Sequence, residues 1–413
     1  MSVDTAMRIG RGGPDAWIDG LIAGHPADRA LHQSFYSDPD IFQRDIERML
    51  MRHWLCAGHE SSAPNPGDYV VIELASESVI VVRGEDGRLR ALVNVCRHRG
   101  SRLCAARSGS AKMFVCPYHA WSYGLDGRLR AARHMPDGFD TSAYGLKQIH
   151  LRVIEGLAFV SFAEAPLALT EVERTLQSGY GPYGWAQAKV AHRELYPIEA
   201  NWKLAVENYV ECYHCAPAHP EYARLHVNEQ PRVRIAKLNA EMEERTAVLG
   251  LEIRTGDHWA LLAAPGEEAA YCMRYAMYGG VVTGSADGRP VAPLMGQFND
   301  YDGGATFIHV GPASFFLAYP DHGLIYRFVP KTPWTSEMEV IWLVRGDARE
   351  GIDYDLGRLT WLWRVTSEAD KRIIEHNQLG VNSRYYEPGP YAPMEANTRR
   401  FTEWYLAAIA GGR

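Results

Sequence analysis

The sequence lacks the features that would suit a membrane or a nucleic acid as partner. Its 413 residues carry a formal net charge of -7 without a long run of one sign, so it offers no basic patch for DNA, RNA or lipid headgroups. No stretch is apolar enough to span a bilayer, and residues 1–20 are polar and glycine-rich, unlike a signal peptide. We therefore expect a cytoplasmic protein with no nucleic acid and no membrane partner.

Cysteine is scarce and unevenly placed. There are 7 cysteines, an odd number, and three of them lie in or beside two short motifs that also contain histidine. This distribution favours thiolate metal ligands in a reducing compartment over a disulfide framework. Five cysteines are expected instead to be small buried residues, namely Cys56, Cys104, Cys212, Cys215 and Cys272.

The hydrophobic pattern predicts an α+β fold. Helical spacing indicates a helix within residues 40–60, in an N-terminal helical segment (1–49) that packs on the last domain. Alternating and β-branched runs predict a small antiparallel β domain over 50–165. The rest, 166–413, is expected to be an antiparallel sheet flanked by helices, with helical patterns at 169–180, 201–222 and 353–381.

Two metal-binding half-motifs lie in the β domain. Cys96-x-His98 and Cys116-x-x-His119 are separated by seventeen residues. A structural Cys2His2 zinc site is the alternative, but zinc fingers usually pair cysteine with cysteine and histidine with histidine. Here each half supplies one of each, which delivers two thiolates to one iron and two imidazoles to the other, as in a Rieske [2Fe-2S] centre.

These motifs and their flanks, "NVCRHRG" and "CPYHAWSYGLDGRL", resemble the Rieske domain of the ring-hydroxylating and related non-heme iron oxygenases. The resemblance implies that Cys96 and Cys116 hold one iron of the cluster. It implies that His98 and His119 hold the other.

A second pair of histidines lies in the last domain. His214 and His219 are five residues apart, so on an unbroken helix they would point about 140° apart. Pro217 is expected to disrupt the helix between them, and Pro220 disfavours helical geometry at His219, so the two imidazoles can converge. Two histidines and one carboxylate form the iron site of non-heme Fe(II) oxygenases.

The family's catalytic domain carries the motif N-x-x-[DE]-x-Y-H-x4-H at this place, and five residues match it: Asn208, Glu211, Tyr213, His214 and His219. By the same resemblance Asp370, eight residues before Gln378, is the third ligand. Its competitors, Glu368, Asp353 and Asp355, are expected to be solvated helix or loop carboxylates. The preceding "NWK", residues 201–203, is expected to cap and pack the helix.

The resemblance implies a separate role for Glu211. It precedes His214 by three residues and is expected to hydrogen-bond to it. In the family this position is usually Asp, and it bridges the Rieske histidine of a neighbouring subunit to a ligand histidine. The longer Glu departs from that majority and indicates a subgroup. Asn208 is expected to take part in catalysis.

The resemblance implies a terminal oxygenase that uses electrons to activate O2 at a mononuclear Fe(II). Electrons would come from NAD(P)H through a separate flavin or iron-sulfur reductase, since the chain contains no glycine-rich nucleotide fingerprint. A homotrimer with electron transfer between subunits is expected. A protein that only carries electrons would keep the cluster and lack the second iron.

Glu211 and "GVNSRYYEPGPY" look most like the subgroup that oxidises quaternary ammonium compounds such as glycine betaine, proline betaine, carnitine and choline. The expected reaction is hydroxylation of an N-methyl group with release of formaldehyde. An N-methylated cation binds aromatic faces, and the candidates are Phe307, Phe315, Phe316, Tyr319, Tyr326 and Trp259. The alternative is the α subunit of an aromatic-ring hydroxylating dioxygenase.

Overall fold

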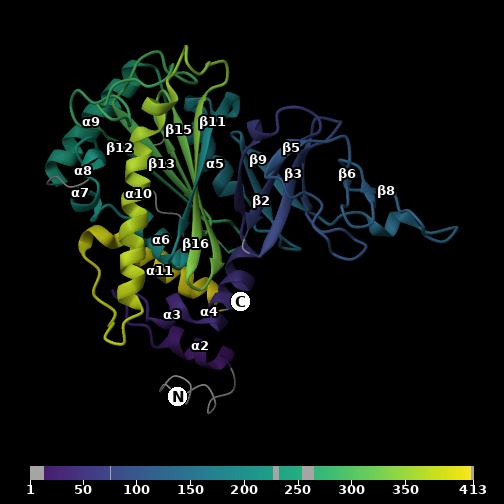
Figure 1. The fold of residues 1–413 in the computed structure, drawn as a ribbon. Helices are drawn as coiled ribbons and strands as arrows, with labels where there is room; N and C mark the ends of the chain where they lie inside the picture. The colour runs from purple at the N-terminus through teal and green to yellow at the C-terminus, as the bar shows by residue number, and fades with distance from the viewer. Residues whose placement is uncertain (1–13, 75, 227–231, 254–264, 411–413) are drawn as a thin grey trace.

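The computed structural model describes residues 14–74, 76–226, 232–253 and 265–410. A smaller β-rich domain lies beside a larger domain built on one extended sheet (Figure 1). The paired strands of the described residues are antiparallel throughout. The expected α+β fold class is confirmed.

The smaller domain contains a 7-stranded sheet with the order β1-β10-β9-β4-β3-β2-β5 and a 3-stranded sheet, β6-β7-β8. The first consists of β1 (Leu55–His59), β2 (Asp68–Leu74), β3 (Glu77–Arg83), β4 (Leu89–Val93), β5 (Ser108–Ser110), β9 (Gln148–Ile154) and β10 (Leu157–Ser161). The second consists of β6 (Phe114–Val115), β7 (Ser122–Tyr123) and β8 (Leu129–Ala131). The loop after β4 and the loop between β6 and β7 carry the two Cys and His half-motifs.

The larger domain is built on a 6-stranded sheet with the order β11-β16-β15-β14-β13-β12. Its strands are β11 (Ala188–Ile198), β12 (Ala270–Ala276), β13 (Gly304–Val310), β14 (Ser314–Ala318), β15 (Gly323–Thr332) and β16 (Thr335–Arg345). Both faces are buried, as the neighbours Phe315 and Phe316 illustrate, because they belong to separate hydrophobic clusters.

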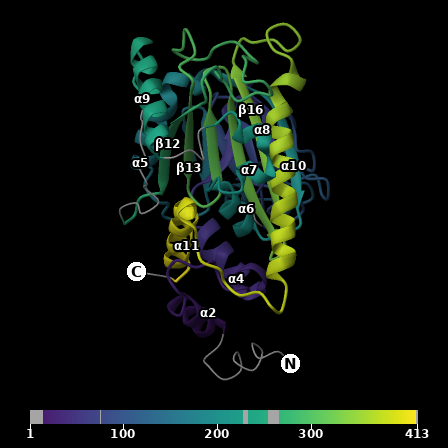
Figure 2. The same ribbon diagram turned by 90° about the vertical axis from the view of Figure 1, so that its left-hand side faces the viewer.

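Helices cover the sheet. They are α5 (Thr170–Tyr180), α6 (Trp202–Tyr209), α7 (Cys215–Ala218), α8 (Pro220–Ala223), α9 (Arg232–Val248), α10 (Leu356–Val381) and α11 (Ala396–Ile409). Figure 2 shows α10 running along the sheet, with α6, α7 and α8 beside it, and all three of these contact α10. Asn201 caps α6 by accepting a hydrogen bond from the Lys203 amide at 3.0 Å, as expected. No helix among the described residues is both long and apolar enough to cross a membrane.

The N-terminal segment contains α2 (Pro14–Ala23), α3 (Ser34–Ser37), α4 (Pro39–Asp45) and a π-helical turn, η1 (Ile46–Leu50). The helix expected within residues 40–60 therefore stops at Leu50. The expectation of helix in the second half of that range was wrong. Leu55 and Cys56 pair instead with Val160 and Phe159 of β10, so tertiary pairing overrides the helical spacing. The domain boundaries after residues 49 and 165 stay a prediction.

A buried ion pair joins the N-terminal segment to α6 and α11. Asp45 binds Lys203, and both side chains are 0% exposed. Asp45 also accepts hydrogen bonds from the Trp202 indole at 3.2 Å and the Tyr405 hydroxyl at 2.7 Å. Breaking a buried pair on one side leaves the other charge uncompensated, which is costly.

We predict that Lys203→Met lowers the free energy of unfolding by about 3–5 kcal/mol, because Asp45 stays buried without its counter-charge. The measurement is denaturant unfolding of wild type and variant. The control is Lys371→Met, which breaks the more accessible pair with Glu375 and should cost about 0.5 kcal/mol or less. Equal losses in the two variants would show that the Asp45 pair does not hold this junction together.

Candidate iron centres

The first candidate centre is formed by two loops that face each other. In one, the Cys96 amide bonds to Ser101 and the Gly100 amide bonds back to the Cys96 carbonyl at 3.0 Å. The other repeats this turn, since the Ala120 amide bonds to the Cys116 carbonyl at 3.0 Å. Each loop therefore presents a cysteine and a histidine toward the same space, and the His98 and His119 rings lie 4.6 Å apart.

Burial differs between the two kinds of residue in this centre. Cys96 and Cys116 are 3% and 2% exposed, whereas His98 is exposed and His119 is half-buried. The Tyr123 hydroxyl lies 3.3 Å from the Cys96 sulfur, and Trp121 stacks on His98. Burial opposes ionisation of Cys116, but amide donors from Tyr118 and His119 outweigh it and lower the pKa of that thiol. The loops thus fit a cluster with buried thiolates and outward imidazoles.

The second candidate centre lies where α6 gives way to α7 and α8. His214 precedes α7, and His219 separates α7 from α8 with the non-helical angles φ -145° and ψ 75°. The break therefore falls just before Pro220, as expected. Pro217 lies inside α7, so its expected role in breaking the helix was wrong; a proline is tolerated in a first helical turn.

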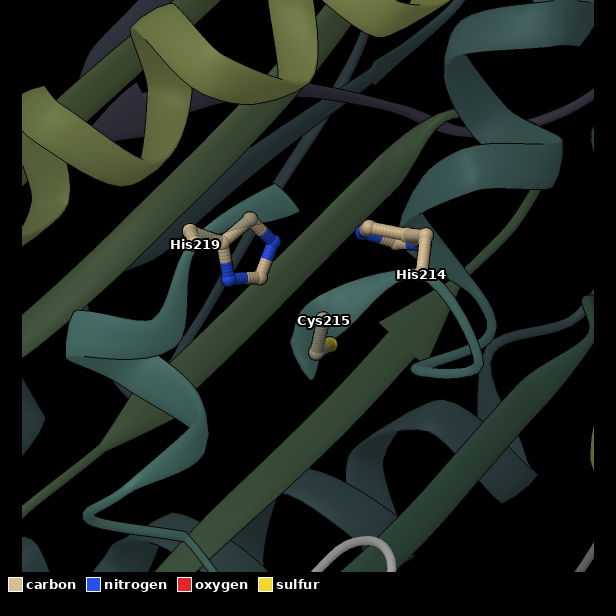
Figure 3. A group of neighbouring side chains, drawn as sticks. All are labelled: His214, Cys215 and His219. Atoms are coloured by element: carbon tan, nitrogen blue, oxygen red, sulfur yellow. The ribbon is translucent and has the colours of Figure 1, made fainter. Parts of the chain in front are cut away.

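The two histidines converge on α10. Figure 3 shows the rings of His214 and His219 turned toward each other, with Cys215 on the short helix between them. Asp370 Oδ1 lies 3.2 Å from Nε2 of each ring. The His219 ring nitrogens and Asp370 Oδ1 are buried without a hydrogen-bond partner among the described residues. A metal ion would satisfy His219 Nε2 and Asp370 Oδ1 together, so the residues fit mononuclear iron.

The competing carboxylates lie elsewhere. Asp355 caps α10 by accepting a hydrogen bond from the Arg358 amide at 2.8 Å, and Asp353 pairs with Arg349. Glu368 is on the exposed side of α10. Of the four acidic candidates, Asp370 is the one that the structure brings to the histidines.

Glu211 binds the other side of the His214 ring. Its Oε1 lies 2.6 Å from His214 Nδ1, and its Oε2 accepts hydrogen bonds from the Tyr213 and His214 amides. Burial alone would lower the pKa of His214, but Asp370 and Glu211 outweigh it and raise the pKa to about 9. Glu211 thus fixes the ring so that Nε2 faces Asp370. The Asn208 amide nitrogen is 3.3 Å from the same Nε2.

Cys212 and Cys215 were expected to be small buried residues. Cys215 is buried, but Cys212 is half-buried, so the expectation for Cys212 was wrong. The two sulfurs form a disulfide. The Cys215 sulfur lies near the imidazole nitrogens of His214 and His219, but the disulfide occupies it, so it is not a thiolate ligand here. Cys56, Cys104 and Cys272 are free and buried, as expected.

A cavity of about 440 Å³ opens beside the second centre. Of the aromatic residues expected to line it, Phe307 and Tyr326 do. Phe315 packs behind Tyr209, and Trp259 lies outside the described residues. The remaining two belong to the core: Phe316 contacts Trp185 and Tyr319 hydrogen-bonds to His226.

Sequence reasoning missed four aromatic residues of this cavity: Tyr209, Tyr222, Tyr275 and Trp363. Two of them carried a usable signal. Tyr222 follows His219 by three residues and so stays near it in the chain, with ring centroids 5.5 Å apart. Trp363 precedes Asp370 by seven residues in α10, so helical spacing places it on the face of that ligand. Tyr209 and Tyr275 depend on strand and helix packing that no local pattern indicates.

Comparisons with known proteins cover both domains. Residues 53–150 match the family model of the Rieske [2Fe-2S] domain, and residues 185–411 match the ring hydroxylating alpha subunit (catalytic domain). The chain is 36% identical over 404 residues to the glycine betaine monooxygenase oxygenase subunit of Chromohalobacter salexigens, covering 95% of this chain and 88% of that protein. It is 38% identical over 219 residues to the Escherichia coli carnitine monooxygenase oxygenase subunit. That match covers 51% of this chain and 58% of that protein.

Solved structures show the same fold. A quaternary ammonium Rieske monooxygenase in complex with L-carnitine superposes with a TM-score of 0.69 at 22% identity, covering 95% of this chain and 99% of that one. Naphthalene 1,2-dioxygenase with bound indole gives a TM-score of 0.65 at 18% identity. That match covers 94% of this chain and 93% of that one. The chain is an oxidoreductase of the ring-hydroxylating alpha subunit family, whose members carry a Rieske [2Fe-2S] cluster and a mononuclear iron.

Proposed function

We propose that this protein is the terminal oxygenase component that hydroxylates an N-methyl group of a small quaternary ammonium compound. The balanced reaction converts the quaternary ammonium, with O2, two electrons and two protons, to the N-hydroxymethyl ammonium and water. The C–N bond to the hydroxymethyl carbon then breaks to give the tertiary amine, formaldehyde and a proton. The similarity to glycine betaine and carnitine monooxygenase subunits supports this substrate class.

The charge of the cavity lining is the observation that carries the proposal. Among the described residues the lining includes three carboxylates, Glu211, Glu243 and Asp370, and one cationic residue, Arg274. Arg274 is ion-paired with Asp302, and both side chains are 0% exposed, so its charge is already neutralised. Glu211 is likewise engaged by His214, and Asp370 would bind the iron, so Glu243 is the carboxylate of the described lining that favours a cation over an anion such as a benzoate.

Aromatic faces supply the rest of the recognition. Tyr209, Tyr222, Tyr275, Phe307, Tyr326 and Trp363 line the same cavity. A methylated ammonium is held by such faces with about 0.5 to 2 kcal/mol per contact. Amide and hydroxyl groups of Asn239, Thr366 and Asn397 also line it and can hydrogen-bond to the polar end of a betaine.

We assign the ligands as follows. Cys96 and Cys116 would hold one iron of the cluster, and His98 and His119 the other. His214, His219 and Asp370 would hold the mononuclear iron, which supplies the reduction of O2 and the oxidation of the methyl group when bound. Glu211 orients His214, and the aromatic wall excludes water from the substrate.

Electron entry would occur between subunits. The loops around β6 and β8 lie far from α7 in Figure 1, which supports transfer from the Rieske centre of one chain to the catalytic iron of its neighbour in a homotrimer. Glu211 would join the two centres by its contact with His214. A separate reductase would supply the electrons, and the cytoplasmic location stays a prediction.

An aromatic-ring hydroxylating dioxygenase is the second candidate. The six aromatic residues of the lining would also bind a neutral arene, which needs no counter-charge. A protein that only carries electrons is less well supported, because His214, His219 and Asp370 converge with unsatisfied atoms.

We predict that Asp370→Ala loses the mononuclear iron and turnover while the visible spectrum of the Rieske cluster is unchanged, because the two centres use separate ligands. Iron content and absorbance measure the two effects. Glu368→Ala, two residues away on the exposed side of α10, is the matched control and should keep all of its iron. Iron loss in the control, or full iron in Asp370→Ala, would contradict the ligand assignment.

We predict that Glu211→Gln keeps both metal centres and slows single-turnover electron transfer by about tenfold or more, because the amide no longer accepts a strong hydrogen bond from His214. Stopped-flow oxidation of the prereduced cluster in the presence of substrate and O2 measures the rate. Transfer at the wild-type rate would remove Glu211 from the electron path.

The proposed function is tested by supplying a reductase, NADH and O2 and screening two sets of compounds. One contains glycine betaine, proline betaine, carnitine and choline, and the other contains benzoate and neutral arenes. We predict formaldehyde from a member of the first set, because Glu243 and the aromatic faces of the cavity hold a cation. Diol formation from an arene, without formaldehyde from any quaternary ammonium compound, would support the dioxygenase instead.

A further inference from the structure

A second cavity, of about 300 Å³, lies against the catalytic centre. It shares Asn208, Glu211 and His214 with the substrate cavity, and its remaining lining is different. Glu207, Tyr36, Tyr386, Tyr391 and Glu395 supply hydroxyl and carboxyl groups to it. A space of this size with several polar groups has room for a chain of water molecules. We call it the proton cavity.

Glu207 is hydrogen-bonded to another residue of this lining. The Tyr36 hydroxyl is 3.0 Å from each of its carboxyl oxygens. Glu207 is on α6 and Glu211 follows the end of that helix, and both side chains line the proton cavity. The half-buried Glu207 side chain thus lines the same cavity as Glu211 at the wall of the iron centre.

The charge state of Glu207 follows from its surroundings. Burial raises its pKa to about 8, and the Glu395 carboxylate adds to the rise, while Tyr36 and Lys203 partly oppose it. Lys203 is itself engaged by Asp45. Tyr386 donates to the Leu31 carbonyl, and Tyr391 pairs with Thr402. The carboxyl is therefore protonated at neutral pH and loses its proton as the pH rises through about 8.

The reaction needs protons at this place. Reduction of O2 with insertion of one oxygen atom consumes two electrons and two protons, whatever the substrate is. Glu211 is occupied as an acceptor for His214 and two amides, and Asp370 lies between the two histidines. Glu395 accepts a hydrogen bond from the Ala392 amide. Among the described carboxyl groups of the proton cavity, Glu207 is the one placed to give a proton.

We propose that Glu207 is the proton-supplying residue of the oxygenase, passing protons from water in the proton cavity to the catalytic centre on the side of Glu211 and His214. Each transfer breaks the O–H bond of the Glu207 carboxyl and forms an O–H bond on the neighbouring water. A proton from the outer water then restores the carboxyl. No electron moves in this step, and two such transfers balance one turnover.

Glu207→Gln tests this directly, because the amide keeps the volume and a hydrogen bond to Tyr36 but cannot supply a proton. In the holoenzyme, single-turnover product formation should slow by about tenfold or more. The wild-type rate should fall as the pH rises through the carboxyl pKa, and the variant should lose this dependence and show a changed solvent deuterium isotope effect. Glu207→Asp should restore part of the rate. Glu194→Gln, whose carboxylate pairs with Arg364 outside the cavity, is the control.

Infrared spectroscopy gives a readout that does not depend on turnover or substrate. The holoenzyme at neutral pH should show a protonated carboxyl band that shifts in heavy water and is absent from Glu207→Gln. Tyr36→Phe, which leaves Glu207 in place, should shift this band. Absence of a protonated carboxyl in the wild type would overturn the proposal, as would a Glu207→Gln variant with wild-type rate, pH profile and isotope effect. If Glu207→Gln does not fold, an unshifted band in Tyr36→Phe overturns it.

Discussion

The catalytic centre depends on holding the chain segment between α6 and α8 against α10. His214 and His219 come from that segment and Asp370 from the long C-terminal helix, more than a hundred residues later in the sequence. Asp370 Oδ1 lies at equal distance from the two imidazoles, 3.2 Å. Two polar contacts fix the relation of the helices: the Asn201 amide donates to Gln378 at 2.8 Å, and Glu375 accepts from the Glu199 amide at 3.0 Å. Because both contacts lie near the start of α6, the helix that leads to the histidines has a defined position.

The two sides of the centre differ in chemistry. Toward the substrate cavity the lining is aromatic with carboxylates, which suits a cation that must be kept away from bulk water. Toward the proton cavity it contains hydroxyl and carboxyl groups, which suit water. Asn208, Glu211 and His214 form the boundary between the two. This division would let protons reach the centre without opening the substrate side to solvent.

The sequence predicts the local parts of this arrangement and misses the non-local ones. The half-motifs around Cys96 and Cys116 and the contact of Glu211 with His214 follow from short spacings, and the structure has them where they were expected. The position of Asp370 was predicted through resemblance, because no local pattern relates α10 to the histidines. Tyr209 and Tyr275 reach the cavity by tertiary packing, and the end of the N-terminal helix is decided by pairing of Cys56 with Phe159. The disulfide between Cys212 and Cys215 has a local signal, the Cys-x-x-Cys spacing, which was not used in the prediction.

One chain is expected to hold both a Rieske cluster and a separate mononuclear iron. Quantitative analysis of iron, labile sulfide and zinc in the purified protein distinguishes this arrangement from the alternatives. We expect the two irons and two sulfides of a cluster plus one further iron for each chain, without zinc. Stoichiometric zinc without labile sulfide would contradict the Rieske assignment, and iron in the amount of the cluster alone would contradict the catalytic centre.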